Sequence, residues 1–230
     1  MNILKKITSY FTKFELWLWF CSVILIISSF LIFNRENYLT LITSLIGVTA
    51  LVLLAKGNPI GQILIITFSI LYVIISYSYR YYGEMATYGG MSMPMAVLSL
   101  ITWLKNPSKN GKSEVKINKI KKAEMVFMCF LSLAVTVAFY FMLKYWGTSN
   151  LIMSTISIFT SFCAAYLTMR RSPYYALFYA LNDTVLIVLW TLATIHNLAY
   201  MSVIVCFIVF LVNDSYGFIS WQKRQSKQSE

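Results

Sequence analysis

The chain has 230 residues, of which 59% are hydrophobic and only 12% are charged, and its formal net charge is +11. A soluble domain needs roughly 25% charged residues to cover its surface, so the composition excludes an ordinary soluble fold and predicts an all-α integral membrane protein. The longest polar stretch, from Lys105 to Lys122, is too short to bury the core of a separate soluble domain.

Apolar runs long enough to cross a bilayer, at about 20 residues each, recur along the whole chain. They predict about eight transmembrane helices, near residues 16–33, 38–55, 60–79, 87–104, 124–146, 150–169, 174–194 and 198–220. The first run follows Lys5 and Lys6 but has no small-residue cleavage pattern, which indicates an uncleaved span rather than a signal peptide.

The basic residues fall mainly on one side of these spans. If the N-terminus is cytoplasmic, the inside segments hold sixteen Lys and Arg residues and the outside segments hold three, namely Arg35, Arg80 and Lys144. Because positively charged loops stay in the cytoplasm, we expect a multi-pass protein of the cell membrane with both termini cytoplasmic. The charge therefore reports topology, and no basic face with interleaved aromatics indicates a nucleic-acid partner.

Prolines punctuate the helices. Pro59 and Pro173 each follow a basic turn and mark the starts of the third and seventh spans, since the missing N–H of proline costs nothing at a helix start. Pro94 follows the segment YGEMATYGGMSM at the start of the short fourth span. It indicates either a kinked helix that acts as a hinge or an irregular outer loop that leads into the helix.

The sequence contains a weak internal repeat. LLAKGNP (53–59) resembles LTMRRSP (167–173), and ITWLK (101–105) resembles ISWQK (219–223). The spacing predicts an extra first helix (1–37), a three-helix unit (38–105), a basic loop with a linker helix (106–149), a second three-helix unit (150–222) and a tail (223–230). Such a 3+1+3 parallel repeat places substrate between its units, although chance matching is the alternative in apolar sequence. Trp103 and Trp221, each followed closely by a basic residue, are typical of interfacial anchors.

Polar groups at bilayer depth concentrate in the second unit. Asn182 and Asp183 lie near the middle of the seventh span, and Asn213 and Asp214 lie about two turns from the inner end of the eighth. Their first-unit counterparts at the repeat offsets are 68–69 and 95–96. Buried ionisable groups usually line a pathway or meet a partner, so these pairs indicate either a binding site or hydrogen bonds between neighbouring helices.

Tyr175, Phe178 and Asn182 share one helical face at spacings of three, four and seven, with Tyr179 beside it. Aromatic rings leading to an amide suit a planar heteroaromatic ligand, and a cationic ring would gain about 0.5–2 kcal/mol from cation–π contacts. The alternative interpretation is an aromatic belt at the membrane interface.

The sequence offers little for catalysis or for a metal. Its four cysteines are scattered without CxxC spacing, and no Walker A, GxSxG or HExxH motif occurs. We therefore expect no metal, no cofactor and no enzymatic activity. An enzyme that uses Asp183 with Asp214, and a proton-coupled carrier working through Asp183, remain as alternatives.

Several stretches resemble the PnuC vitamin transporters over about residues 38–225. They are LLAKGNPIGQILIITFSILYVIISYSYRYYGE, ITWLKNP, SPYYALFYALNDTVLIVLWTLA and VNDSYGFISWQKR. The resemblance implies a SWEET-like 3+1+3 core that carries nicotinamide riboside by facilitated diffusion. It also implies a cytoplasmic kinase that traps the substrate by phosphorylation. The oligomeric state stays open, and a homo-oligomer is compatible with the sequence.

The family's motif, two tryptophans three apart with Asn four residues later, falls on Tyr175, Phe178 and Asn182. Both indoles are absent here, so thiamine, riboflavin and deoxynucleosides remain alternative substrates. The expected substrate-binding residues are Tyr175, Phe178, Tyr179, Asn182, Asp183, Asn213 and Asp214.

Overall fold

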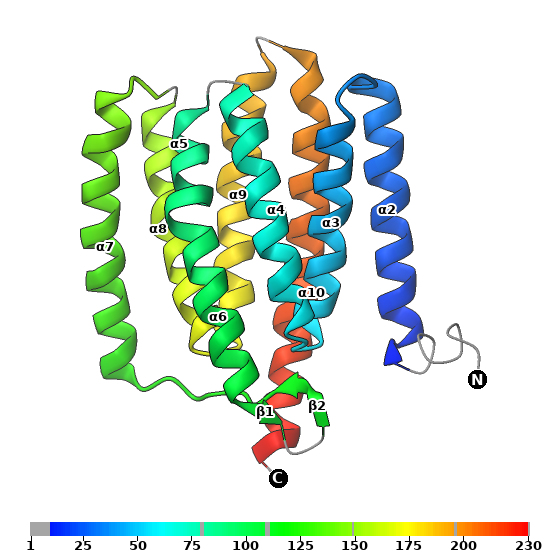
Figure 1. Cartoon of the computed structure of the whole chain (residues 1–230), viewed down its shortest axis with the longest axis vertical. Helices are drawn as coiled ribbons and strands as arrows, with labels where there is room; N and C mark the ends of the chain where they lie inside the picture. Colours follow the sequence, from blue (N-terminus) through cyan, green and yellow to red (C-terminus); the bar gives the residue numbers. More distant parts are fainter. Residues whose placement is uncertain (1–9, 79–80, 109–110, 149, 196, 230) are drawn as a thin grey trace.

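The structure is a computed structural model that describes residues 10–78, 81–108, 111–148, 150–195 and 197–229. Within these residues, seven helices are long and apolar enough to cross a membrane, which confirms the predicted all-α membrane fold. They run side by side in Figure 1: α2 (Lys13–Phe33), α3 (Tyr38–Ala55), α4 (Ile60–Ser78), α7 (Lys122–Tyr145), α8 (Leu151–Met169), α9 (Tyr174–Thr194) and α10 (Met201–Ser229). A short 3₁₀ turn, η2 (Leu198–Tyr200), precedes α10.

The fourth predicted span is helical but not uniform. It consists of α5 (Tyr82–Ala86), a π-helical turn η1 (Thr87–Ser92) and α6 (Met93–Lys105), which follow one another without a break. Pro94 lies in the first turn of α6, directly after the π-helical turn. The irregular outer loop considered from the sequence is therefore absent, and the irregularity is the π turn.

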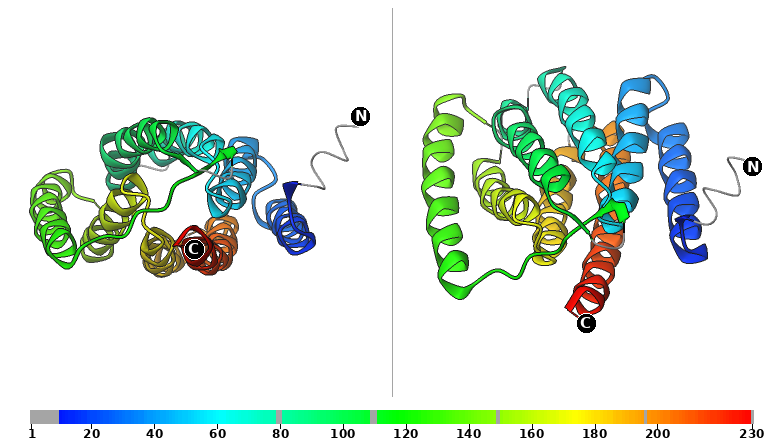
Figure 2. Two further views of the ribbon diagram at one scale, coloured as in Figure 1. Left: turned by 90° about the horizontal axis from the view of Figure 1, so that it is seen from below. Right: turned by 60° about the horizontal axis from the view of Figure 1, so that its bottom comes forward.

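Six helical segments form a ring around the centre of the bundle. α3, α4 and α6 make one side, and α8, α9 and α10 make the other. α3 packs against α10 and α6 packs against α8, which closes the ring, as the view from below in Figure 2 shows. α2 lies outside the ring against α3 and α10, and α7 lies outside it against α8.

The turns after α3 and α8 have the same geometry. Gly57 and Arg171 both adopt left-handed backbone angles, with φ of 69° and 58°. The amide after each donates to the carbonyl five residues earlier, at 3.0 Å after Gly57 and 2.9 Å after Arg171. This is the Schellman arrangement that ends a helix. Pro59 and Pro173 then directly precede α4 and α9, as the sequence predicted.

The interfacial role expected for Trp103 and Trp221 is wrong, because both side chains are fully buried. The Nε1–H of Trp103 donates to the carbonyl of Thr168 at 2.9 Å, and that of Trp221 donates to the carbonyl of Leu54 at 2.8 Å. Each indole thus caps a helix on the other side of the ring, and the two rings lie 5.5 Å apart. Neighbours from the opposite side of the bundle cover them, which the local Trp–Lys pattern does not reveal.

The loop after α6 forms a strap across one end of the bundle. It begins with a small antiparallel sheet of β1 (Pro107–Ser108) and β2 (Gly111–Val115). The amide of Val115 then donates to the carbonyl of Gly57, and that of Asn118 to the carbonyl of Arg171, both at 2.9 Å. The strap therefore holds both turns, and Arg224 of α10 pairs with Glu114 at 2.6 Å.

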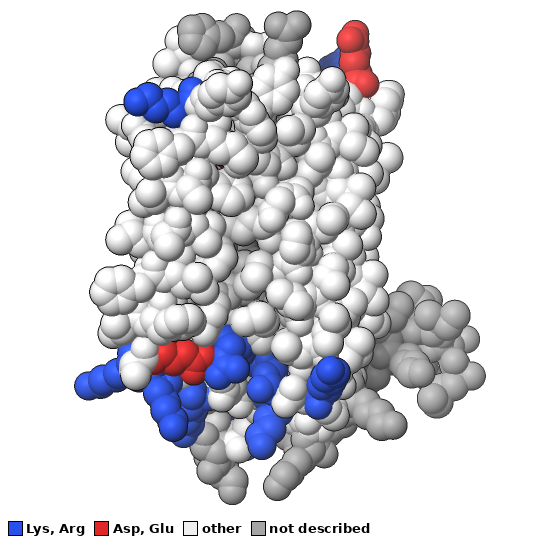
Figure 3. Space-filling view, turned by 60° about the vertical axis from the view of Figure 1, so that its left-hand side comes forward, with Lys and Arg blue, Asp and Glu red and all other residues white. Residues whose placement is uncertain are grey.

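Residues 223–229, expected as a tail, continue α10 as helix. The end of the bundle where α2 begins and α10 ends is here named the basic end. It carries most of the described Lys and Arg residues, and an uncharged band lies above it in Figure 3. Arg35 and Lys144 lie at the opposite end, and Arg80 lies outside the described residues.

α2 is attached to the ring by a buried ion pair. Nζ of Lys56 lies 3.2 Å from Oε2 of Glu15, and the hydroxyl of Tyr216 in α10 donates to Oε1 of Glu15 at 3.0 Å. Glu15 also closes the capping box of Thr12 at the start of α2. These contacts hold the start of the extra helix against both sides of the ring.

Candidate functional site

A small cavity of about 60 Å³ lies inside the helical ring. Both sides of the ring contribute to its walls, and the amide and carboxyl groups come from α9 and α10. The lining residues are Gly47, Leu51, Leu54, Ile65, Phe68, Ser69, Tyr88, Ser92, Ser161, Tyr179, Asn182, Asp183, Phe207, Phe210 and Asp214.

Asn182 is held in place by two hydroxyl groups of α8. Its Oδ1 accepts hydrogen bonds from Oγ of Ser157 at 3.0 Å and from Oγ1 of Thr160 at 2.8 Å. Among the described residues no acceptor pairs with its Nδ2 group. The fixed amide therefore presents N–H donors to the cavity, a suitable arrangement for recognising a carbonyl or hydroxyl group.

Asp183 and Asp214 meet at the cavity wall, where their buried carboxyl groups interact directly. In the described part of the chain, neither Oδ2 of Asp183 nor Oγ of Ser69 has a hydrogen-bond partner. A buried polar atom without a partner costs about 1–3 kcal/mol. A ligand with hydroxyl or amide groups would supply those partners.

Tyr179 is the fourth expected residue that lines the cavity. Tyr175, one turn earlier, is buried with its ring 4.9 Å from that of Trp221. Phe178 is half-buried and packs on the apolar core without lining the cavity. The shared helical face predicted for the aromatics therefore does not bring Tyr175 and Phe178 to the cavity in this conformation.

Asn213 also lies away from the cavity. Its Nδ2 donates to Oγ of Ser22 in α2 at 3.0 Å and to the carbonyl of Val209 at 2.8 Å. It therefore links α10 to the extra helix, while its neighbour Asp214 faces the cavity.

Sequence reasoning missed the aromatic wall formed by Phe68, Tyr88, Phe207 and Phe210. Their ring centroids lie 5.7–5.8 Å apart between Phe68 and Phe210, Phe68 and Tyr88, and Phe207 and Phe210. The repeat offset of 114 marked residues 68–69 as the counterparts of 182–183, and this was the signal for Phe68 and Ser69. The other rings resemble any aromatic residue of an apolar helix.

Gly47 allows this wall to close. A Cβ atom at this position would lie 2.4 Å from Cζ of Phe210 and 3.0 Å from Cδ2 of Phe68. Real Cβ atoms do not approach other atoms so closely, so any larger residue displaces the rings.

In the described part of the chain, no three His, Cys, Asp or Glu side chains gather as a metal site.

Comparison with known proteins identifies the family. The model of the nicotinamide mononucleotide transporter family matches residues 37–223. The chain belongs to this family. It is therefore a multi-pass membrane transporter and not an enzyme, which confirms the expectation from the sequence and removes the enzymatic alternative.

Two relatives place the chain more closely. The nicotinamide riboside transporter PnuC of Neisseria mucosa is 22% identical over 203 residues, which cover 86% of this chain and 77% of that protein. The crystal structure of the vitamin B3 transporter PnuC superposes with a TM-score of 0.82 at 20% identity, covering 95% and 94% of the two chains. The structural likeness shows a shared fold that includes the region before the family match.

Proposed function

We propose that this transporter carries nicotinamide riboside across the cell membrane by facilitated diffusion. The family match and the name of the relative from Neisseria mucosa support this substrate. The observation that carries the proposal is the pair of buried, unpartnered oxygens, Oδ2 of Asp183 and Oγ of Ser69, at a cavity with aromatic walls. A ligand with a ribose and a planar ring has both the polar groups and the flat surface that such walls recognise.

Each lining residue has a chemical role in this proposal. Asn182 donates through Nδ2 to the carboxamide or to a ribose hydroxyl, and Asp183 and Asp214 accept from hydroxyl groups and attract the positive ring. Tyr179 and Phe68 supply ring faces, on which an aromatic cation gains about 0.5–2 kcal/mol.

In this proposal, three further residues support the site without lining the cavity. Tyr175 and Phe178 support α9 by packing, and Asn213 holds α10 against α2.

The proposal requires movement of the walls. Ligand pockets usually measure about 300–1,000 Å³, whereas this cavity measures about 60 Å³, so the conformation is closed around the centre. The units 38–105 and 150–222 would rock about the site as a SWEET-like parallel repeat, with α7 as the linking crossing and α2 as the extra helix. The matched turns at Gly57 and Arg171 and the reciprocal indole bonds support such a repeat.

The basic end would face the cytoplasm, in keeping with the positive-inside rule, which places both termini there. Phosphorylation by a cytoplasmic kinase would then trap the substrate, because a charged phosphate cannot return through an apolar path.

Uptake into liposomes that contain the purified protein and no energy source tests the proposal. We expect saturable uptake of nicotinamide riboside that is insensitive to an imposed pH gradient and is lost in Asn182→Ala. Uptake of thiamine, riboflavin or a deoxynucleoside instead would reassign the substrate. A dependence on the pH gradient would indicate a proton-coupled carrier, and no uptake of any of these compounds would refute the proposal.

A further inference from the structure

Besides Asp183, Asp214 and the ion-paired Glu15, a further buried carboxylate lies at the end of the bundle opposite the basic end. Glu84 in α5 is only 2% exposed, and among the described residues its Oε2 has no hydrogen-bond partner. A buried carboxylate without a partner is strongly disfavoured unless a positive charge or a proton neutralises it. Such groups in membrane transporters usually mark a substrate or ion pathway.

Aromatic side chains lie near Glu84. Tyr81 and Tyr88, three residues before it and four residues after it, have the spacing of one helical face, and Tyr72, Tyr81 and Tyr88 each interact with it electrostatically. The ring centroids of Tyr72 and Tyr88 are 4.3 Å apart, and those of Tyr81 and Trp190 are 4.8 Å apart. Several ring faces beside one carboxylate form a surrounding that favours an organic cation.

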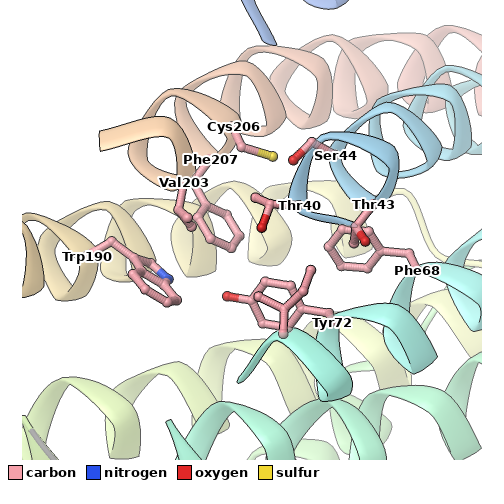
Figure 4. Close-up of a pocket in the computed structure, with 10 residues that line it drawn as sticks. Thr40, Thr43, Ser44, Phe68, Tyr72, Trp190, Val203, Cys206 and Phe207 are labelled. Carbon is pink, nitrogen blue, oxygen red and sulfur yellow. The ribbon is translucent and has the colours of Figure 1, made fainter. Parts of the chain in front are cut away.

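A small cavity of about 10 Å³ adjoins these rings, between α3, α4, α9 and α10. In Figure 4 the indole nitrogen of Trp190 and the hydroxyl of Tyr72 point toward each other across it. The two groups interact with each other, and in the described part of the chain Oγ1 of Thr40 has no hydrogen-bond partner. Three polar groups are therefore directed into a space that is closed in this conformation.

An aromatic layer separates this region from the central cavity. Phe68 and Phe207 line both cavities, and Tyr88 lines the central cavity while it interacts with Glu84 and with Asp183. Tyr88 thus lies near the carboxyl groups of both Glu84 and Asp183.

The π-helical turn η1 directly follows α5. Such turns often occur at functional sites, where they interrupt the regular helix. A Cβ atom on Gly90 would meet only Cζ of Phe139, at 3.9 Å, so this face of the turn is open, whereas a Cβ atom on Gly89 would meet Cγ2 of Val73 at 3.2 Å. A shift of α5 relative to α6 could therefore open the closed region around Glu84.

We propose that this region is an outer binding site for a cationic heteroaromatic ring such as an N-substituted pyridinium. The site consists of Glu84, Tyr72, Tyr81, Tyr88 and Trp190. The site binds the ring before it passes the aromatic layer to the central cavity. The inference rests on the proposed function only for the identity of the transported molecule. Carboxylate and ring faces recognise the positive charge, so a neutral ring of the same shape binds poorly.

Thermal melting of the purified full chain with two small probes tests this site. N1-methylnicotinamide carries the positive ring, and nicotinamide is its neutral counterpart. A ligand that binds only the folded state raises Tm by mass action. We expect a saturable rise with N1-methylnicotinamide and none with nicotinamide at the same concentration.

Four variants locate the binding. Glu84→Gln should weaken the apparent affinity for N1-methylnicotinamide by about tenfold or more. Glu36→Gln, which removes an exposed carboxylate at the same end of the bundle, should keep the wild-type response. Asn182→Ala should lose only the part of the response that comes from binding in the central cavity. Tyr81→Leu should weaken binding as well, and it tests the site even if Glu84→Gln does not fold.

The proposal is overturned if the two probes act alike on the wild type, or if Glu84→Gln and Tyr81→Leu keep the full response. It is also overturned if Asn182→Ala abolishes the response, because the probe would then occupy the central cavity alone. Liposomes that take up no vitamin while the charge-selective response persists would refute the proposed function and not this site.

Discussion

On one side of the ring, α3, α4 and η1 bring Gly47, Phe68, Ser69 and Tyr88 to the central cavity, whereas on the other side α9 and α10 bring an amide and two carboxyl groups. At the basic end the same two sides are almost interchangeable, with matching left-handed turns and reciprocal indole hydrogen bonds. Backbone geometry is thus shared where the helices turn, and side-chain chemistry differs where a ligand would bind.

The largest expected effect comes from removing the side-chain amide of Asn182. Asn182→Ala removes the donor to the ligand and leaves the hydroxyl of Ser157 without its acceptor, whereas the hydroxyl of Thr160 can still donate to backbone carbonyls of α8. Lost hydrogen bonds of about 1–3 kcal/mol each predict about 100-fold weaker binding of nicotinamide riboside by calorimetry. Asn213→Ala is the matched control, because this amide bonds to Ser22 away from the cavity. Equal losses in both variants would contradict the assignment of the site to α9.

The second prediction tests whether the two helix ends capped by Trp103 and Trp221 are equivalent. Trp103→Phe and Trp221→Phe each remove a buried N–H donor and part of a buried ring, while the helix carbonyl keeps its hydrogen bond to a backbone amide of the following turn. Each should lower the free energy of unfolding by about 1–3 kcal/mol, measured by denaturant titration in detergent. The two losses should agree within about 1 kcal/mol if the two indole hydrogen bonds are equivalent. A much larger loss for one variant would show that its indole contributes more to stability. The double variant should be non-additive, since the indoles are 5.5 Å apart.

The sequence predicted the scaffold better than the site, for physical reasons. The length of an apolar run and a proline after a basic turn are local properties, so α3 and α9 begin and end where the sequence places them. Periodicity groups Tyr175, Phe178 and Asn182 on one face, but it does not say which part of that face meets the centre. Tyr179 does so instead of Tyr175, because Trp221 already covers Tyr175.

Local sequence patterns did not predict contacts between residues that lie far apart in the chain. The burial of Trp221 depends on Leu54, and the strap depends on backbone contacts with both turns. Glu84 looked like part of a polar outer loop, because its burial depends on neighbouring helices such as α4, against which α5 packs.

The third prediction concerns the aromatic wall on the first side. Gly47→Ala places a Cβ atom 2.4 Å from Cζ of Phe210, so the ring must move toward the cavity. We expect uptake of nicotinamide riboside into liposomes to fall by about tenfold, since overpacking costs about 1–3 kcal/mol. Gly217→Ala is the matched control on the second side, because its Cβ atom would meet that of Ala176 at an ordinary 3.5 Å. Wild-type uptake by Gly47→Ala would show that Phe210 does not shape the substrate path.

The smallest expected effect concerns the two left-handed turns. Arg171 adopts a φ of 58° that its side chain disfavours, whereas Gly57 adopts 69° without that cost. Left-handed geometry costs a residue with a Cβ atom roughly 1 kcal/mol. Arg171→Gly should therefore stabilise the protein and Gly57→Ala should destabilise it, each by up to about 1 kcal/mol, with opposite shifts in Tm.

Arg171→Lys is the control for the charge, because it keeps the positive side chain and the strained angle and should leave Tm nearly unchanged. A fall in Tm for Arg171→Gly together with Arg171→Lys would mean that the guanidinium group itself holds this turn. The turn after α8 would then be stabilised by the side chain of Arg171. The turn after α3 has Gly57 at the same place and lacks such a side chain.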